Sequence, residues 1–314
     1  MSPGRILVTG ASGFVGRHLL TELHRRFPSD AIAAAGFDVS DPAAVSDGVA
    51  EARPDALVHL AAIAAPSEAR KDPDAAWRIN LGGTLNLARA VLATEPACVL
   101  LFVSSADAYG HSFATGTPLD ETAPLAPLNT YGATKAAADL ALGAMVVDGL
   151  RCIRLRPFNH TGPGQSEAFA VPAFARQIAR IEAGLQEPVI DVGALDASRD
   201  FMDVRDVCAA YAEALARAGA LPPGAILNLA SGHARRMEDV LQDLLRVSGL
   251  RAEIRTEPSR LRSSEISAAR GDAGLARRLL GWAPRIPWEQ TVRDVLADWR
   301  ERVRRQQSSH GAHS

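Results

Sequence analysis

Apolar and polar positions follow one another along this chain in blocks. Short continuous apolar runs, such as RILVTG (residues 5–10) and CVLLFVSS (98–105), precede longer stretches with helical spacing. Similar runs predict strands at 31–40, 55–62 and 151–158. Continuous apolar runs that alternate with helices are typical of a parallel sheet covered on both faces. The pattern therefore predicts an α/β fold, a Rossmann-type doubly wound parallel sheet.

The rhythm changes after residue 158 and divides the predicted fold into two parts. A dinucleotide-binding domain is expected over residues 1–158 plus about 204–231. A smaller α/β substrate-binding lobe, with the C-terminal helix, is expected over about 159–203 and 232–304. The polar end, residues 305–314, is expected to be a frayed tail.

Composition narrows the class of protein. The 314 residues are 47% apolar, with a formal net charge of -2, so neither nucleic acid nor a membrane surface is expected as a partner. No apolar run approaches the roughly 20 residues of a membrane-spanning helix. The three cysteines show no metal-binding spacing, which predicts reduced thiols, a cytoplasmic location and no metal site.

The first turn of the chain carries a glycine pattern, VTGASGFVG, with Gly10, Gly13 and Gly16 between a predicted strand and a predicted helix. Glycines there allow a tight turn and close approach to a pyrophosphate, which the helix N-terminus attracts. Asp38, 22 residues after Gly16, lies near the place where an acidic residue reads a ribose hydroxyl. Its context, FDVSD, fits a segment under the adenine better, so NAD and NADP both stay open, with NADPH slightly favoured.

Three side chains predict the chemistry. Tyr131 and Lys135 are four residues apart on a predicted helix and face the same way. A nearby ammonium is expected to lower the pKa of the phenol, which would then protonate the oxygen left when hydride reduces a ketone. Ser105 ends a buried strand, where a hydroxyl can polarise the carbonyl.

Taken together, the motifs resemble a known family. The glycine loop, HLAA (59–62), INLGGTLNL (79–87), SSADAYG, YGATK and RPFN occur in the order of the extended short-chain dehydrogenase/reductases. Within that family, RPFNHTGPGQ, DASRDFMDVRDV and GDAGLARRLLGWAPRIP are similar to the reductases of GDP-6-deoxy-4-keto-hexuloses. The resemblance implies NAD(P)H-dependent reduction of the 4-keto group of GDP-4-keto-6-deoxy-D-mannose to GDP-D-rhamnose. It also implies a homodimer, in which helices 72–95 and 130–148 form a four-helix bundle with their partners.

The resemblance also assigns residues to roles. Asn159 and Arg199 match positions that bind the substrate diphosphate, Arg262 and Glu265 match a second clamp, and Asn80 matches a residue that anchors a water near Lys135. The full set expected to bind the cofactor is Gly10, Ser12, Gly13, Phe14, Val15, Gly16, Asp38, Val39, Leu60, Ala61, Ala62, Asn80, Tyr131, Lys135 and Pro157. The set expected to bind substrate is Ser105, Asp107, Asn159, Arg199, Arg262 and Glu265.

Two alternatives stay open. A GDP-mannose 4,6-dehydratase, or another nucleotide-sugar epimerase or dehydratase, shares several motifs. Dehydratases carry a Glu where this chain has Asp107, preceded by Ala106, which cannot transfer a proton, and this difference favours the reductase. A cofactor-sensing binding protein on the same fold is the other alternative, and the intact Ser105–Tyr131–Lys135 set argues against it.

Overall fold

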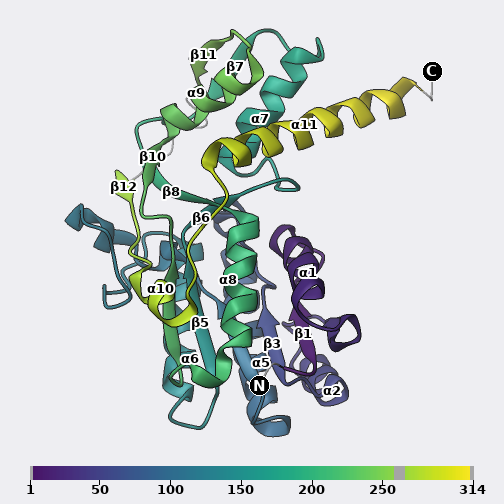
Figure 1. Cartoon of the computed structure of the whole chain (residues 1–314), viewed down its shortest axis with the longest axis vertical. Helices are drawn as coiled ribbons and strands as arrows, with labels where there is room; N and C mark the ends of the chain where they lie inside the picture. The colour runs from purple at the N-terminus through teal and green to yellow at the C-terminus, as the bar shows by residue number, and fades with distance from the viewer. Residues whose placement is uncertain (1–2, 258–265, 312–314) are drawn as a thin grey trace.

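The computed structural model describes residues 3–257 and 266–311, and its largest element is a six-stranded sheet in the order β2-β1-β3-β4-β5-β9 (Figure 1). All its neighbouring strands run parallel. The chain starts in the interior at β1, winds to one edge and then returns to build the other, which confirms the predicted doubly wound fold. The strands are β1 (Ile6–Thr9), β2 (Ile32–Ala34), β3 (Ala56–His59), β4 (Val99–Val103), β5 (Cys152–Pro157) and β9 (Ala225–Leu229).

Helices cover both faces of this sheet because successive strand residues point to opposite sides. Ile6 and Val8 pack with the helices α1 and α8, whereas Leu7 packs with α2, α5 and α6 on the other face. The helices in contact with the sheet are α1 (Phe14–Arg26), α2 (Pro42–Ala52), α5 (Thr84–Thr94), α6 (Thr130–Met145), α8 (Val204–Ala216) and α10 (Gly274–Leu280). Short helical segments between them are η1 (Ser29–Ala31), α3 (Pro66–Lys71), α4 (Pro73–Ala76), η2 (Trp77–Gly83), η3 (Ala106–Ala108), η4 (Gly110–Thr115) and η5 (Ala218–Ala220).

A second apolar core lies beyond the large sheet, at the upper end of the molecule in Figure 1. It is built by the helices α7, α9 and α11 against β7 and β8. Strand β8 pairs with β6, β10 and β12, and β11 pairs with β7. These elements are β6 (Asn159–Thr161), α7 (Ala170–Glu182), β7 (Val189–Val192), β8 (Ser198–Asp203), β10 (Ala234–Arg236), α9 (Met237–Ser248), β11 (Glu253–Thr256), β12 (Ala268–Ala269) and α11 (Trp288–Gly311).

The structure corrects four local expectations. Strand β2 is only three residues long, so most of the strand expected at 31–40 is irregular. The helix expected at 72–95 contains a π-helical stretch, Trp77–Gly83. The tail expected from residue 305 continues α11 to Gly311. Helix α10, which was expected in the smaller lobe, packs in the core of the large sheet. The boundaries near residues 158, 204 and 231 remain a proposed division of the chain.

Candidate active site

A cavity of about 460 Å³ opens where strands β1, β3, β4 and β5 end. Its wall includes Gly10 after β1, Leu60 after β3, Ser104 after β4 and Pro157 at the end of β5. Ligands of open α/β sheets bind at this edge, outside the carboxyl ends of the strands. The topology therefore brings four separate segments of the chain to one binding site.

The glycine loop forms one side of this cavity and has no room for a side chain at Gly10 or Gly16. Gly10 has a φ of +67°, and a Cβ there would lie 2.7 Å from the backbone nitrogen of Ala61. A Cβ on Gly16 would lie 2.3 Å from the carbonyl oxygen of Gly10. Helix α1 begins at Phe14 with no side-chain cap and no acidic residue in its first turn. Its first N–H groups therefore remain available to an anion.

Two buried hydroxyl groups add to the fit for a polar ligand. Ser104 Oγ and the Tyr211 hydroxyl both belong to residues that line the cavity, and neither has a hydrogen-bond partner among the described residues. The open helix N-terminus, the glycine loop and these unpaired groups together fit a dinucleotide. The residues expected to bind the cofactor that line this cavity are Gly10, Ser12, Gly13, Phe14, Val15, Gly16, Leu60, Ala61, Ala62, Tyr131, Lys135 and Pro157.

Asp38, Val39 and Asn80 were also expected to contact the cofactor, but they do not line the cavity. The Asp38 carboxylate accepts hydrogen bonds from the backbone and hydroxyl of Ser40. Val39 is buried, and its side chain occupies the space that a Cβ on Gly83 would need. These contacts hold the turn after β2, so any contact of Asp38 with a ribose remains a proposal.

Asn80 does not line the cavity but forms hydrogen bonds with the segment after β3 and with α6. Its amide oxygen accepts the backbone N–H of Ile63, and its amide nitrogen donates to the Ile63 carbonyl and to the Thr134 hydroxyl. Protein acceptors thus bind both amide hydrogens of Asn80. A water at Asn80 would have to donate a hydrogen bond to one of its oxygens. In this structure Asn80 joins α6 to the segment after β3.

His59, the first residue of HLAA, closes a second buried chain of hydrogen bonds. The Thr84 hydroxyl donates its proton to the Asn80 carbonyl, so it accepts from His59 Nε2. His59 Nδ1 then accepts from the Thr9 hydroxyl, which in turn accepts the backbone N–H of Ala61 in the cavity wall. Burial lowers the pKa of His59 to about 3 and keeps the ring neutral.

Ser105, Tyr131 and Lys135 meet in the same cavity, as the sequence predicted. Helix α6 begins after Asn129, whose side chain caps the N–H of Gly132, and this places Tyr131 in the first turn. The Lys135 ammonium donates to the Val103 carbonyl at 2.7 Å, and burial lowers its pKa to about 8.

The pKa of Tyr131 is raised in this ligand-free structure, whereas a lowered value was expected. Burial raises the pKa of Tyr131 above its usual value, and the negative charge of Asp107 raises it further. The hydrogen bond with Ser105 acts in the opposite direction. Tyr131 is therefore a protonated phenol at neutral pH, which is the state that a proton donor needs.

Asp107 also lines the cavity. Its backbone N–H donates to Ser105 Oγ at 3.1 Å, which orients that hydroxyl. Burial raises the pKa of the Asp107 carboxyl, while Arg199 and a hydrogen bond with Asn129 lower it. Asp107 therefore interacts both with Ser105 and with Arg199, which lines a neighbouring cleft.

That cleft is a second cavity, of about 730 Å³, which adjoins the first. Asn159, His160, Gln165 and Phe169 line both. Arg199 lines the second cavity and is anchored by donating to the carbonyls of Ser198 and Ile266. The structure thus brings Asn159 and Arg199 to one cleft, whereas Arg262 and Glu265 fall outside the described residues.

Comparison with known proteins identifies the family of this chain. Residues 6–230 match the NAD dependent epimerase/dehydratase family. The chain belongs to this family. It is 38% identical to a GDP-6-deoxy-D-mannose reductase of Pseudomonas aeruginosa, covering 96% of this chain and 98% of that protein. It is 28% identical to a GDP-6-deoxy-D-talose 4-dehydrogenase of Aggregatibacter actinomycetemcomitans, covering 88% of this chain and 91% of that protein.

Solved structures of the family agree with the fold. RMD from Pseudomonas aeruginosa complexed with NADPH superposes with a TM-score of 0.87 at 36% identity, covering 95% of this chain and 99% of that one. A UDP-glucose 4-epimerase of Thermus thermophilus in complex with NAD gives 0.81 at 26% identity, covering 94% and 99%. Within residues 3–257 and 266–311, no helix is long and apolar enough to cross a membrane.

The loop from Asn159 to Gln165 is held from both sides, a feature that the motifs did not reveal. From helix α1, Arg17 donates to the Gly164 carbonyl and His18 contacts the Pro163 carbonyl. From helix α11, Asp298 accepts the Gly164 N–H at 2.9 Å and Arg302 donates to the Gln165 carbonyl. The loop therefore connects the cofactor helix of this family fold to the C-terminal helix.

Within this loop, the side chains of His160 and Gln165 hold the local structure. His160 contacts the Phe158 carbonyl and stacks on Phe14, so it is a packed histidine, as its sequence context suggested. The Gln165 side chain accepts from the Thr161 hydroxyl and donates to the His160 carbonyl. Gln165 therefore shapes the loop with both ends of its amide.

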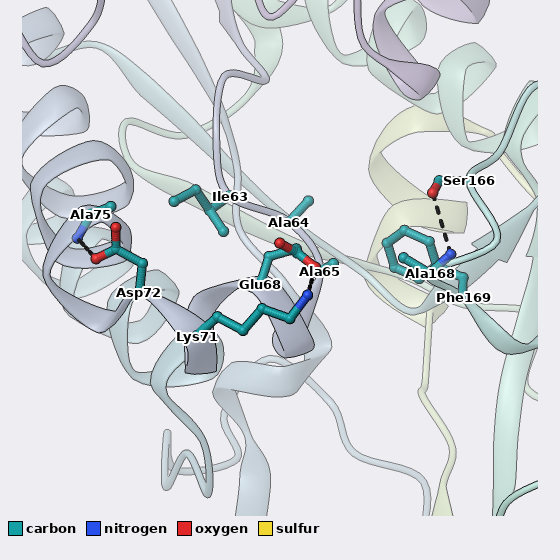
Figure 2. Close-up of a pocket in the computed structure, with 10 residues that line it drawn as sticks. All are labelled: Ile63, Ala64, Ala65, Glu68, Lys71, Asp72, Ala75, Ser166, Ala168 and Phe169. Carbon is teal, nitrogen blue, oxygen red and sulfur yellow. Dashed lines mark hydrogen bonds and ion pairs between the residues drawn. The ribbon is translucent and has the colours of Figure 1, made fainter. Parts of the chain in front are cut away.

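A third hollow, of about 510 Å³, lies at the mouth of the site (Figure 2). Figure 2 shows Ile63 and α3 on one side and Phe169 on the other. The Lys71 ammonium pairs with Glu68 at 2.9 Å at its edge. Phe169 lines all three hollows, so it stands where the cofactor and substrate cavities meet the outside.

Proposed function

We propose that this chain reduces the 4-keto group of GDP-4-keto-6-deoxy-D-mannose with NADPH or NADH and yields GDP-D-rhamnose. The observation that carries the proposal is that Ser105, Tyr131 and Lys135 line one cavity with the glycine loop, next to a cleft that holds Asn159 and Arg199. The name of the Pseudomonas relative, a GDP-6-deoxy-D-mannose reductase, supports the choice of substrate.

The cofactor, when bound, supplies the hydride. Its pyrophosphate would be held by the backbone of the glycine loop and the N-terminus of α1, through N–H groups in the first turn such as those of Phe14 and Val15. We favour NADPH because the Pseudomonas structure was solved with it. Comparison of KM for NADPH and NADH tests this preference.

The protein's own groups handle the charge and the proton at the keto oxygen. Ser105 Oγ, oriented by the Asp107 N–H, donates a hydrogen bond to this oxygen. Tyr131 then passes its phenolic proton to the oxygen as negative charge develops there. Lys135 contributes a positive charge, which stabilises the phenolate that Tyr131 becomes.

Substrate binding is assigned to the adjoining cleft. Arg199 offers a fixed guanidinium to the diphosphate, and Asn159 offers an amide donor. Asp107 would hold a sugar hydroxyl between Ser105 and Arg199. Arg262 and Glu265 stay candidates for a second clamp, on the strength of the resemblance alone.

Location and assembly are part of the proposal. Cys98, Cys152 and Cys208 are free and buried, which supports a reducing, cytoplasmic setting. A homodimer through a four-helix bundle is supported by apolar side chains that α6 and the turn after it leave exposed: Leu140 is 61% exposed and Val147 is 90% exposed.

The test is to mix the purified protein with GDP-4-keto-6-deoxy-mannose and NADPH, then NADH, and to follow absorbance of the reduced nicotinamide. Oxidation of the cofactor with a new GDP-deoxyhexose is expected, and NMR of that product separates rhamnose from its talose epimer. Tyr131→Phe should lose most of kcat while still binding NADPH. Conversion of GDP-mannose alone, without net oxidation of the cofactor, would instead indicate a dehydratase.

A further inference from the structure

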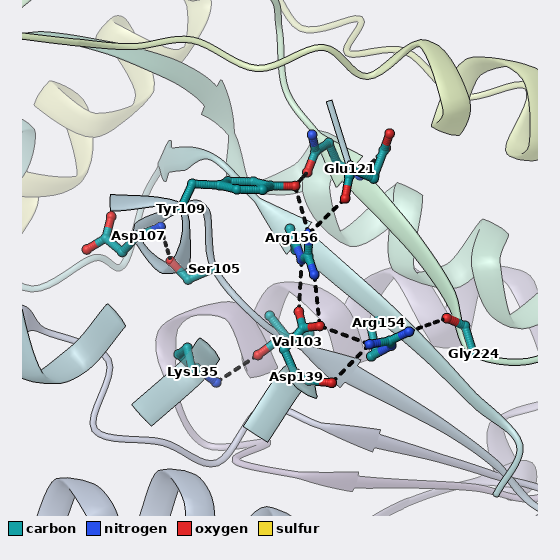
Figure 3. Close-up of polar contacts among 11 residues, drawn as sticks. Val103, Ser105, Asp107, Tyr109, Glu121, Lys135, Asp139, Arg154, Arg156 and Gly224 are labelled. Atoms are coloured by element: carbon teal, nitrogen blue, oxygen red, sulfur yellow. Dashed lines mark hydrogen bonds and ion pairs between the residues drawn. The ribbon is translucent and has the colours of Figure 1, made fainter. Parts of the chain in front are cut away.

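A buried ion cluster lies near Ser105 and Lys135 (Figure 3). Asp139, on α6, is fully buried and accepts from Arg156 at 2.9 and 3.0 Å. Arg154 adds a contact to the same carboxylate at 3.2 Å. Both arginines come from β5, two residues apart, so they point to the same side of the sheet. The cluster ties helix α6, which carries Tyr131, to the strand that ends at the cavity.

Stability alone does not account for these charges. Removing two ions from water is costly, and apolar side chains of similar size often stabilise a buried position equally well. The arginines also have partners other than Asp139: Arg156 donates to the hydroxyl of Tyr109, and Arg154 donates to the Gly224 carbonyl. The Asp139 charge also acts on a group in the active site.

That group is Lys135. Asp139 follows it by four residues, one helical turn, so the two side chains lie on the same face of α6. The Lys135 ammonium donates to the Val103 carbonyl and lies 4.9 Å from the centre of the Phe102 ring, with no carboxylate bonded to it in the described structure. Burial lowers the pKa of Lys135 to about 8, and Asp139 is the charge that raises it.

The other titratable neighbours cannot replace Asp139. His59, from β3, is neutral because burial lowers its pKa to about 3. Tyr131, on α6 itself, is protonated because burial raises its pKa. From β5, Arg154 and Arg156 carry positive charge and so oppose the field of Asp139.

We propose that Asp139 is a positioning residue of this active site: held by Arg156, its carboxylate keeps the Lys135 ammonium charged beside Tyr131. The consequence for catalysis rests on the proposed function. The charge state of Lys135 does not, because it is a property of the unliganded protein.

The sequence makes a direct measurement possible, since it contains only two lysines, Lys71 and Lys135. Protein labelled with ¹³C at lysine Cε should give two NMR signals, and Lys71→Arg assigns them. The Lys71 side chain is 73% exposed, so the two signals report different surroundings. Titration of the Lys135 signal in the full-length, ligand-free protein reads its pKa without any substrate.

Three variants give different expected results. Asp139→Asn removes the charge with little change in shape, and we expect the Lys135 pKa to fall by about one unit. Arg154→Gln removes an opposing positive charge at a less buried place, and we expect the pKa to rise. Glu121→Gln is the control: its carboxylate binds the Asn228 N–H in the same network, away from Lys135. We expect no shift for this variant.

An unchanged Lys135 pKa in folded Asp139→Asn would overturn the proposal. If that variant does not fold, Arg154→Gln decides, and an unchanged pKa there overturns it equally. With substrate, the high-pH limit of kcat should move with the Lys135 pKa in each variant. A wild-type protein that shows no reductase activity would refute the proposed function but would leave the NMR result decisive for Asp139.

Discussion

Tyr109 and Tyr211 are both fully buried, but the surroundings of their hydroxyl groups are opposite. The Tyr109 hydroxyl donates to Asn228 Oδ1 at 2.7 Å and accepts from Arg156 at 3.0 Å. The Tyr211 hydroxyl has no partner among the described residues. Both side chains are 0% exposed. Replacing each by Phe deletes the same oxygen and leaves the ring in place.

The expected effects differ in size and in sign. Tyr109→Phe leaves an amide oxygen and a guanidinium N–H unpaired away from water, which costs about 2–4 kcal/mol for the two groups. For a chain of this length, that lowers Tm by about 4–8 °C, at roughly 2 °C per kcal/mol. Tyr211→Phe removes an unsatisfied hydroxyl and should leave the stability of the ligand-free protein unchanged or slightly raised.

The assay is thermal unfolding of the ligand-free variants, checked by urea titration. The m-values should match that of the wild type, so that a change in midpoint reports stability. Equal losses of stability in the two variants would refute the reasoning, since the hydrogen bonds would then not be what distinguishes them. A loss confined to Tyr211→Phe would show that its hydroxyl has a partner in solution.

Three further predictions follow from the structure. Gly16→Ala places a methyl group against the Gly10 carbonyl, so calorimetric titration should show at least tenfold weaker NADPH binding, a loss of about 1.4 kcal/mol. Gly219→Ala is the control: its methyl group would lie in open space, and NADPH binding should be unchanged. In the unfolded chain His59 is protonated below about pH 6.5, whereas in the folded protein it stays neutral until about pH 3. The free energy of unfolding should therefore fall as pH decreases through this window. In urea titrations, His59→Gln should make that fall smaller. Leu140→Glu should shift a dimer toward monomer in light scattering, since this exposed leucine lies on the proposed interface; an unchanged mass would place the interface elsewhere.

Much of the fold was predictable because buried parallel strands appear in the sequence as short apolar runs. The apolar run at β4 identifies a central strand, and the glycine loop marks the start of α1. The shortness of β2 was not predictable, because Gly36 and the turn held by Asp38 interrupt a run that is still apolar in composition. The π-helical stretch at Trp77–Gly83 was hidden as well, since it covers only 7 residues between helical segments.

The expectation of a frayed tail from residue 305 was wrong because a polar composition was interpreted as a sign of disorder. Helix α11 continues past Arg304 through pairs along its own surface, such as that of Arg305 with Glu301. It also packs into the second core through Val303. Such support comes from tertiary packing and i,i+4 pairs, which a polar composition alone does not exclude.

That Ser105, Tyr131 and Lys135 share one cavity was predictable from their spacing, but the ion cluster beside them was not. Ser105, Tyr131 and Lys135 stand in motifs, whereas Asp139 and Arg156 come from separate segments and meet only in the fold. The signal was present, however. Two arginines at alternate positions of a buried strand must find partners, and Asp139 stands one helical turn after Lys135.

The order of the elements has a consequence for how the protein is made. The buried stripe of α1, with Leu19 and Leu23, packs against α8, whose Tyr211 and Leu215 are translated long afterwards. At 5–20 residues per second, α1 waits on the order of ten to forty seconds for its partner. During that time the growing chain carries an uncovered apolar surface, so chaperones that shield nascent chains would act on the first half of this protein. A fragment that ends at β5 would keep that surface permanently and would aggregate.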